Sequence, residues 1–507
     1  MDMKKRARSG LLLALSVSAV AATLSAVPAQ AAGSSSPELR WRPCAQEGGP
    51  DRQECAELSV PLDYGDPEGP RTRLGVSRVP SDRPEARRGT LIVIPGGPGG
   101  SGTQRLAQKG KALQKELGGA YDLVALDPRG IGGSDRTGCG LSDEDRDLVN
   151  LRPWPGPDGD IADSVRRARR VADACAREGG PLLRSMSTAN EARDIDSFRS
   201  ALGEEKLSAF ATSYGTYVAA QYAQKYPDRT DRWVLDSNGD PDPERVARGW
   251  SANLSPAMEQ RFPDFARWAA DPAREKDGPE GGGGLRLARR AEDVRPMVVA
   301  LAERLDRHPK PTTTPGRPLT GNRLRQALQL AMYGDTVFAG TARLIKDAGD
   351  PRATPALPAA LAGSVPEHEA AVTVSTICND VRWPRRSLPA TARDVAADRA
   401  RYPLTGGMPV GVFPCAFWKW APAEEPARIT SDGPSNVLMI QNLRDPATPY
   451  FGALKMREAL GRRARMISVD SGGHGAYLGT GNACGDRKVT DFLRTGERPE
   501  KDVLCAR

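Results

Sequence analysis

Short, continuous runs of apolar and often β-branched residues recur in two parts of the chain. They lie at residues 89–96, 121–130, 207–214 and 231–238, and again at 436–445 and 464–473. Runs of this length, separated by helical patterns, are typical of strands buried on both faces of a parallel sheet. Three earlier runs, at 39–44, 55–64 and 72–80, are also strand-like. The pattern predicts an α/β fold with a mostly parallel central sheet.

The alternation of strands and helices stops between residues 241 and 400. This segment carries helical patterns such as 322–334 and few strand signals. The simplest interpretation is one α/β domain with a large, mainly helical cap inserted before the last strands. We therefore expect a first core segment at 32–240, the cap at 241–400 and a C-terminal core segment at 401–507.

The first 31 residues have the pattern of a secretory signal peptide. Basic residues within positions 4–8 precede an apolar run at 11–27, and a small-residue cleavage site ends at Ala31. The alternative is a transmembrane anchor, but a run of about 17 residues lies at the low edge for spanning. The first cysteine, Cys44, follows too late for a lipid anchor. We expect cleavage near Ala31 and a secreted, extracellular protein with no stable membrane anchor.

Charge and cysteine usage narrow the class of protein. The 72 basic and 64 acidic residues are interleaved, which is typical of a charged soluble surface and does not indicate a nucleic-acid partner. The absence of clustered Cys and His with ligand spacing indicates no metal site, and we expect no cofactor. Eight cysteines in an exported chain indicate disulfides, although about a hundred pairings are possible. Spacing favours pairing of sequence neighbours: Cys44 with Cys55, Cys139 with Cys175, Cys378 with Cys415, and Cys484 with Cys505.

Ser213 lies where a strand-like run ends and a helical pattern begins. The small residues Ala211 and Gly215 flank it at the spacing of a nucleophile elbow, a strained strand–turn–helix, although glycine usually holds the position of Ala211. The backbone N–H of Tyr214 would then point into an oxyanion hole.

The glycine-rich segment 95–102 is expected to supply the second oxyanion donor. Gly97 is favoured and Gly96 comes next, because glycines let the backbone pass close to a substrate. The alternative, a phosphate-binding loop, lacks the Gly-Lys-Ser/Thr that such loops carry.

The chain contains three histidines, and His474 is the candidate general base. His308 and His368 lie in the insertion in polar surroundings, whereas His474 directly follows the last predicted strand. Asp445 ends the preceding strand and is the candidate acid. Asp432 is weaker because it precedes that strand. The order Ser213, Asp445, His474 is that of α/β-hydrolases.

Several segments together resemble the secreted tripeptidyl aminopeptidases of actinomycetes, in the proline iminopeptidase-like branch of the α/β-hydrolases. They are PGGPGGSG (95–102), YDLVALDPRGIGGSD (121–135), STANEARDIDSFRSALG (187–203), the segment 213–241, NLRDPATP and GGHG. The resemblance runs from about residue 40 to the C-terminus, and the part from about 400 resembles the family's C-terminal region. Ala211 departs from the usual elbow glycine, and Pro95 stands where proline iminopeptidases carry His.

The resemblance implies release of short peptides, often three residues long, from peptide substrates with a free N-terminus. Such an enzyme needs an anion for the substrate ammonium. Asp380, in the family's C-x-D motif, is the first candidate, with Glu367 and Glu369 next; each is equally compatible with a surface acid of the cap. The rival hypotheses are a carboxylesterase or lipase with the same triad, and a non-catalytic binding protein on this scaffold. Nothing in the sequence indicates the oligomeric state.

Overall fold

The computed structural model describes residues 39–44, 48–242, 246, 248–277 and 284–506. The predicted signal peptide lies outside the described residues. Within the described part of the chain, no helix is both long and apolar enough to cross a membrane.

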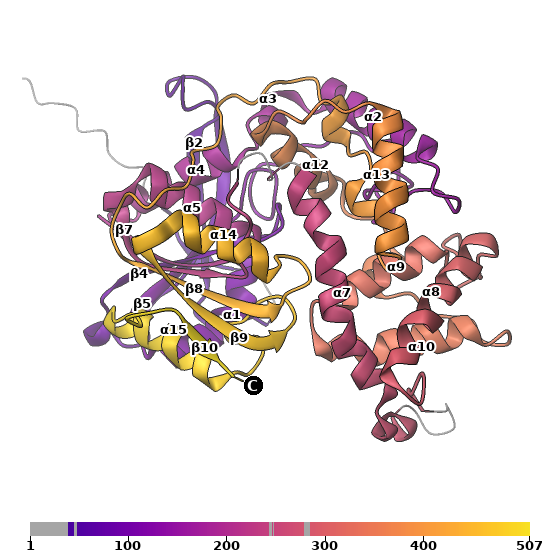
Figure 1. Cartoon of the computed structure of the whole chain (residues 1–507). Coiled ribbons are helices and arrows are strands. Elements are labelled where there is room, and N and C mark those ends of the chain that lie inside the picture. Colours follow the sequence, from indigo (N-terminus) through magenta and orange to yellow (C-terminus); the bar gives the residue numbers. More distant parts are fainter. Residues whose placement is uncertain (1–38, 45–47, 243–245, 247, 278–283, 507) are drawn as a thin grey trace, which may run out of the picture. The chain divides into compact units, whose positions relative to one another are not determined.

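The described residues form a sheet of ten strands (Figure 1). The strands are β1 (Arg42–Pro43), β2 (Glu54–Pro61), β3 (Arg71–Val79), β4 (Gly89–Ile94), β5 (Tyr121–Leu126), β6 (Leu207–Thr212), β7 (Thr230–Asp236), β8 (Val437–Arg444), β9 (Ala464–Gly472) and β10 (Val503–Cys505). Their order across the sheet is β1-β2-β3-β5-β4-β6-β7-β8-β9-β10. The pairs β1–β2, β2–β3 and β3–β5 are antiparallel, and all other neighbouring strands pair parallel. The predicted mostly parallel sheet is confirmed; β10, with only three residues, carried no recognisable pattern.

Helices cover both faces of the sheet. On one face lie α1 (Gly102–Leu117) and α15 (Ala483–Thr495), and on the other α4 (Thr188–Ala201), α5 (Tyr214–Lys225) and α14 (Tyr450–Leu460). Successive strand residues point to opposite faces, so Phe210 packs in the α1 layer while Ala209 and Ala211 pack in the α5 layer. Burial on both faces explains why these strands read as continuous apolar runs.

Between β7 and β8 the described residues form helices and no strand. The α-helices described there are α7 (Arg248–Ala270), α8 (Ala291–Arg307), α9 (Gly321–Ala331), α10 (Phe338–Gly349), the short α11 (Ala359–Ala362), α12 (Glu367–Asp380) and α13 (Leu388–Arg401). Helices α7 to α10 share a hydrophobic core of their own, which includes Phe265, Val298 and Leu328. The 3-10 turns among the described residues are η1 (Pro84–Ala86), η2 (Pro227–Arg229), η3 (Pro272–Lys276), η4 (Asp335–Val337), η5 (Met408–Val410), η6 (Pro414–Phe417) and η7 (Gly461–Arg463).

A second helical piece packs with these cap helices. Helices α2 (Ala162–Glu178) and α3 (Gly180–Arg184) lie between β5 and α4 in the sequence. Leu183 and Cys175 share a buried cluster with Ala371 and Val374 of α12. Part of the expected core segment 32–240 therefore lies against the cap. The sequence pattern did not predict this, because an amphipathic helix reveals its apolar face but not the surface that the face covers.

Four disulfides join the cysteines in the neighbouring pairs that spacing favours: Cys44–Cys55, Cys139–Cys175, Cys378–Cys415 and Cys484–Cys505. The second pair fastens the loop after β5 to α2, the third fastens α12 to η6, and the fourth fastens α15 to β10. Each bridge restricts the unfolded chain and is typically worth about 2–4 kcal/mol.

Candidate active site

Ser213 lies at a sharp turn between β6 and α5. Its backbone adopts φ 61° and ψ −129°, a conformation that costs a residue with a side chain on the order of 1–3 kcal/mol. The turn is held from the neighbouring strand, because the Ser213 N–H donates to the carbonyl oxygen of Asp236 at 2.9 Å. This is the strand–turn–helix geometry that presents a serine hydroxyl above the carboxyl ends of the strands.

The residues around this turn must be small for different reasons. A Cβ on Gly215 would lie 2.4 Å from the carbonyl oxygen of Pro95, and one on Gly96 would lie 2.7 Å from the Cβ of Ser213. Both positions therefore need glycine because the backbones approach so closely. Ala211 is fully buried in the core below the turn. Its methyl group packs there, so the departure from the usual glycine is accommodated.

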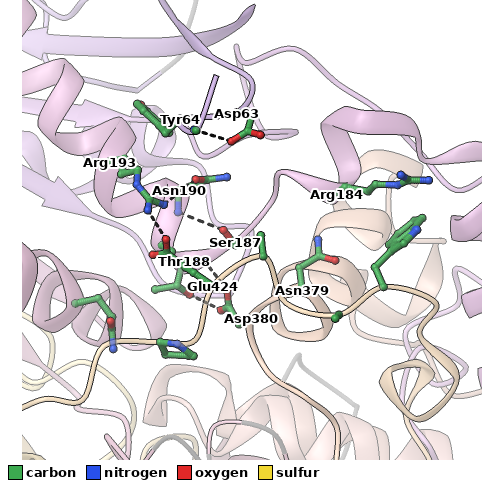
Figure 2. A pocket seen from close by; sticks show the side chains of 17 residues that line it. Asp63, Tyr64, Arg184, Ser187, Thr188, Asn190, Arg193, Asn379, Asp380 and Glu424 are labelled. Atoms are coloured by element: carbon green, nitrogen blue, oxygen red, sulfur yellow. Dashed lines mark hydrogen bonds and ion pairs between the residues drawn. The ribbon is translucent and has the colours of Figure 1, made fainter. Parts of the chain in front are cut away.

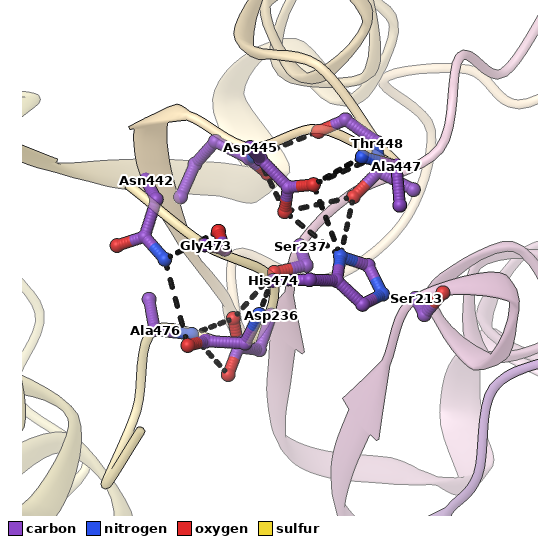
Figure 3. Close-up of polar contacts among 12 residues, drawn as sticks. Ser213, Asp236, Ser237, Asn442, Asp445, Ala447, Thr448, Gly473, His474 and Ala476 are labelled. Atoms are coloured by element: carbon purple, nitrogen blue, oxygen red, sulfur yellow. Dashed lines mark hydrogen bonds and ion pairs between the residues drawn. The ribbon is translucent and has the colours of Figure 1, made fainter. Parts of the chain in front are cut away.

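Asp445 and His474 come together next to Ser213. The Nδ1 atom of His474 lies 3.0 Å from Oδ1 and 2.9 Å from Oδ2 of Asp445. A carboxylate only accepts hydrogen bonds, so Nδ1 carries the proton and Nε2 remains free to accept one. Figure 3 shows the imidazole between the Asp445 carboxylate and Ser213. The arrangement suits proton transfer from the serine hydroxyl to the ring.

Opposing effects set the pKa of His474. Burial is the largest single effect and lowers it, since the side chain is 10% exposed, whereas the charge and hydrogen bond of the Asp445 carboxylate and the charge of Asp236 together raise it. The net pKa lies above the ordinary value. Asp445 is itself held by the backbone N–H groups of Ala447 and Thr448, at 2.8 and 2.9 Å. The site therefore stabilises a protonated imidazole.

Asp236 and Ser237 support the histidine loop from β7, a role that the sequence pattern did not reveal. The Asp236 carboxylate accepts from the N–H groups of Ala476 and Tyr477 at 2.8 and 3.0 Å, and the Ser237 hydroxyl accepts from the Gly475 N–H at 2.8 Å. Burial raises the pKa of Asp236 to about 6, although these hydrogen bonds oppose the shift. The available signal was a polar pair ending a buried strand at the same sheet edge as the serine.

The glycine-rich loop 95–102 connects β4 to α1 beside the elbow. Its far end is fixed by Asp127, whose carboxylate accepts from the Ser101 hydroxyl at 2.7 Å. Gly97 has φ 128°, which glycine adopts far more readily than other residues. Tyr214 is the first residue of α5, and the first N–H groups of a helix have no acceptor within it. These features suit the expected oxyanion donors.

Asp380 lies close to the elbow through the side chain of Tyr214. Its carboxylate accepts from the Thr188 N–H at 2.7 Å, from the Thr188 hydroxyl at 2.5 Å and from the Tyr214 hydroxyl at 3.0 Å. The side chain is buried, and burial raises the pKa of Asp380 to about 6. Asp380 is thus already well supplied with hydrogen-bond donors from the protein.

The other candidate acids and bases have different surroundings. Glu367 accepts the Cys139 N–H at 2.6 Å and so anchors the loop after β5. Glu369 is exposed on the first turn of α12. His308, at the end of α8, and Asp432 are also exposed.

Glu191 of α4 is an acidic residue that the sequence pattern did not single out. Burial raises its pKa to about 8, and the nearby carboxylates of Asp194 and Asp380 add to the shift. Asp194 is paired with Arg129 at 2.8 Å, but among the described residues no side chain or N–H donates to the Glu191 carboxylate. Glu191 lines a small cavity together with Gly99 of the glycine-rich loop. It is the least satisfied acid near the elbow.

A cavity of about 420 Å³ opens beside these acids (Figure 2). Its lining combines Asp380 and Thr188 with the charged side chains of Arg184, Arg193 and Glu424. Ser213 and His474 are not among the lining residues. The cavity therefore reaches Asp380, but neither Glu191 nor the nucleophile is among its lining residues.

Comparison with known proteins identifies the family of this chain. The family described as alpha/beta hydrolase fold matches residues 89–337, and the family described as TAP-like protein matches residues 407–505. A tripeptidyl aminopeptidase of Streptomyces lividans is 32% identical over 484 residues, which cover 92% of this chain and 86% of the relative. This chain belongs to the tripeptidyl aminopeptidase family of α/β-hydrolases.

Other proteins similar to this chain carry different names. Serine protease Hip1 of Mycobacterium tuberculosis is 28% identical over 490 residues, covering 92% of this chain and 91% of the relative. Carboxylesterase B of Mycobacterium tuberculosis is 28% identical over 496 residues, covering 93% and 90%. The chain is thus a serine hydrolase of the peptidase kind, and the predicted fold and enzyme class are confirmed.

Proposed function

We propose that the protein releases short peptides from free N-termini through an acyl-enzyme formed on Ser213. His474 Nε2 takes the hydroxyl proton while Ser213 Oγ attacks the scissile carbonyl carbon. The resulting oxyanion accepts hydrogen bonds from the N–H of Tyr214 and of Gly97 or Gly96; one such donor is worth about 3–4 kcal/mol of barrier. His474 then protonates the leaving amine, and water hydrolyses the ester by the reverse sequence.

One observation carries the proposal: the imidazole of His474 lies between the Asp445 carboxylate and Ser213 (Figure 3). The positive φ of Ser213 supports it, because strained backbone conformations concentrate at active sites. The test is labelling with a fluorophosphonate, which reacts with an activated serine. The wild type should label and Ser213→Ala should not, with its thermal unfolding unchanged. Equal turnover of a tripeptide anilide by Ser213→Ala would refute the assignment.

To recognise the free N-terminus of a substrate, the enzyme needs a carboxylate whose distance from the nucleophile matches the length of a few substrate residues. Three residues of extended peptide span about 10 Å, and we infer that the acidic residues beyond Tyr214 lie within that reach of Ser213. Asp380 was the first candidate on sequence grounds. Glu191 is the better candidate, because no described residue donates to its carboxylate and a substrate ammonium would satisfy it.

Matched substrates test this assignment. Glu191→Gln should lower kcat/KM for a free tripeptide anilide by about 10- to 100-fold, the loss expected for a charge-assisted hydrogen bond. It should leave the slow turnover of the N-acetylated tripeptide unchanged, since that substrate has no ammonium. Glu369→Gln, on an exposed acid of α12, is the control. Equal losses on both substrates would mean that Glu191 does not read the ammonium.

The relatives named tripeptidyl aminopeptidase support a released peptide of three residues. We infer that the cap limits the substrate to about three residues before the scissile bond. Mass spectrometry of products from a mixture of longer peptides tests this: tripeptides should dominate. Free single amino acids or internal fragments would exclude a tripeptidyl exopeptidase.

Carboxylester hydrolysis is the second candidate function, because one relative is named Carboxylesterase B. The same triad would serve both reactions. The two functions can be distinguished by comparing the turnover of the free tripeptide, the N-acetylated tripeptide and a simple acyl ester. A carboxylesterase would turn over the ester far faster than either peptide, whereas the proposed peptidase should favour the free tripeptide.

We further propose that the protein is exported with cleavage after Ala31. The basic and apolar pattern of the first 31 residues and the four disulfides support export, since disulfides persist in oxidising compartments. N-terminal sequencing of the protein from culture medium should begin at Ala32. Recovery of an uncleaved chain with the cells would contradict this.

A further inference from the structure

Tyr333 brings the cap into direct contact with the proposed base. Its carbonyl oxygen accepts the backbone N–H of His474 at 2.9 Å, and its ring packs edge-on against the imidazole with centroids 5.1 Å apart. The neighbouring Gly473 has a φ of 102°, which strains any residue with a side chain, and a Cβ there would lie only 3.0 Å from the Tyr333 carbonyl oxygen. The histidine loop is thus held from the core by Asp236 and from the cap by Tyr333.

The turn that carries Tyr333 is fastened by a buried arginine of α7. Arg261 is 1% exposed, donates to the Met332 carbonyl oxygen at 3.1 Å, and pairs with both Asp335 and Asp264. Asp264 also accepts from the guanidinium of Arg444 at 2.9 Å.

Arg444 directly precedes Asp445 in the chain, and its guanidinium also pairs with Asp470 of β9 at 2.7 Å. The same group of charges therefore holds the cap turn and the end of β8. The cap turn that contacts His474 is therefore connected, through Arg261, Asp264 and Arg444, to the residue next to Asp445.

We propose that Tyr333 is a positioning residue through which the docked cap orients His474 and shields its ring from water. The inference rests on the proposed acyl-enzyme function. Tyr333 contacts His474 through its ring and its carbonyl oxygen, so its effect on the reaction passes through that base. Tyr333 as a whole is 41% exposed, so this residue contacts the imidazole and also faces solvent.

The shielding has a signature in the pH dependence. The charged and titratable groups facing His474 are Asp445 from β8, Asp236 from β7, Arg105 from α1 and Tyr333 itself. Burial lowers the pKa of His474 against the increase due to the two carboxylates. Removing the Tyr333 ring admits water to the imidazole. Burial then lowers the pKa of His474 by less, so this pKa should rise. The acidic limb of the kcat/KM profile should then move to higher pH.

The experiment compares Tyr333→Ala, Tyr333→Leu and Tyr333→Phe, with Val337→Ala as control. Val337 is 46% exposed on η4, close along the chain. Two readouts are measured: the pH profile of kcat/KM on a free tripeptide anilide, and the rate of fluorophosphonate labelling, which needs His474 but no peptide subsites. Tyr333→Ala should lose about tenfold or more in both, within the range of general-base contributions. Its acidic limb should move up, whereas Tyr333→Phe and Val337→Ala should match the wild type.

Each other outcome has a distinct meaning. Loss of peptide turnover with unchanged labelling would make Tyr333 a peptide-contacting residue and overturn the proposal. An unmoved acidic limb with unchanged labelling would overturn it as well. Tyr333→Leu keeps an apolar side chain of similar bulk at the position, so it preserves the test if thermal unfolding shows that Tyr333→Ala is destabilised. Wild-type pH dependence and labelling of Tyr333→Leu would overturn a role for the aromatic ring edge. Failure of the wild type to label would instead refute the proposed function.

Discussion

The carbonyl oxygen of Asp236 accepts the backbone N–H of Ser213 at 2.9 Å. The carboxylate of the same residue accepts the backbone N–H groups of Ala476 and Tyr477. One residue at the end of β7 thereby holds both the turn of the proposed nucleophile and the loop of the proposed base. The separation of Ser213 and His474 is set by a third strand that contributes no reacting group.

Replacing Asp236 should loosen this connection. In Asp236→Asn one carboxylate oxygen becomes an amide NH2, which faces backbone N–H groups and cannot accept from them. We expect a loss of about 1–3 kcal/mol in the free energy of unfolding, together with a lower kcat. Denaturant unfolding and steady-state kinetics measure the two effects. Asp228→Asn, on the exposed 3-10 turn before β7, is the control; equal behaviour of the two variants would contradict the role of Asp236.

The tautomer of His474 should depend on Asp445. In Asp445→Asn the amide oxygen can still accept hydrogen bonds from the N–H groups of Ala447 and Thr448. The new amide NH2 then donates to Nδ1 of His474, so the ring proton moves to Nε2. The ring then cannot accept the serine proton. We expect kcat to fall by about four orders of magnitude with little change in KM. Asp432→Asn should retain full activity, and a similar loss there would reopen the choice of acid.

The two small residues of the elbow should differ in tolerance. Gly215→Ala places a methyl group against the carbonyl oxygen of Pro95, and we expect a loss of about 1–3 kcal/mol from overpacking with slower fluorophosphonate labelling. Ala211→Gly removes only a buried methyl group from a strand and should cost about 1 kcal/mol or less. The denaturant midpoints of the two variants show which substitution destabilises the protein more. The reverse order would mean that Ala211, and not Gly215, limits the elbow.

Stability should respond to pH through Asp380. Its folded-state pKa, about 6, lies above the ordinary 3.8, so between these values the folded chain keeps a proton that the unfolded chain releases. The contribution of Asp380 to stability is therefore lost as pH rises from about 4 to about 6. Asp380→Asn abolishes this dependence, so its stability relative to the wild type should increase over that window by on the order of 2–3 kcal/mol.

The measurement is denaturant unfolding of both proteins at closely spaced pH values. Asp236 titrates in the same direction, but it is present in both proteins and cancels in the difference. Glu369→Gln, an exposed acid of α12, should follow the wild-type curve. A difference that stays constant between pH 4 and 6 would show that Asp380 ionises normally.

Much of the architecture could be predicted because its signals are local. Strands such as Leu207–Thr212 are apolar throughout, and that pattern alone predicts burial on both faces. The elbow needs a strand, a turn with small residues and a helix, which are contiguous in the chain. The cysteine spacing likewise anticipated Cys139–Cys175 and Cys378–Cys415, where the partners are 36 and 37 residues apart.

The sequence by itself determined the sheet, the helical insertion, the elbow and the triad candidates, since each depends on the order of polar and apolar residues within one segment. Only the tertiary structure decided that Asp236 supports the histidine loop, that Tyr333 covers His474, and that the Glu191 carboxylate has no partner among the described residues. These relationships join segments up to about 240 residues apart. A local pattern shows that a side chain is polar or buried, but hydrogen bonding and the electrostatic effects on pKa depend on which distant groups the fold places next to it.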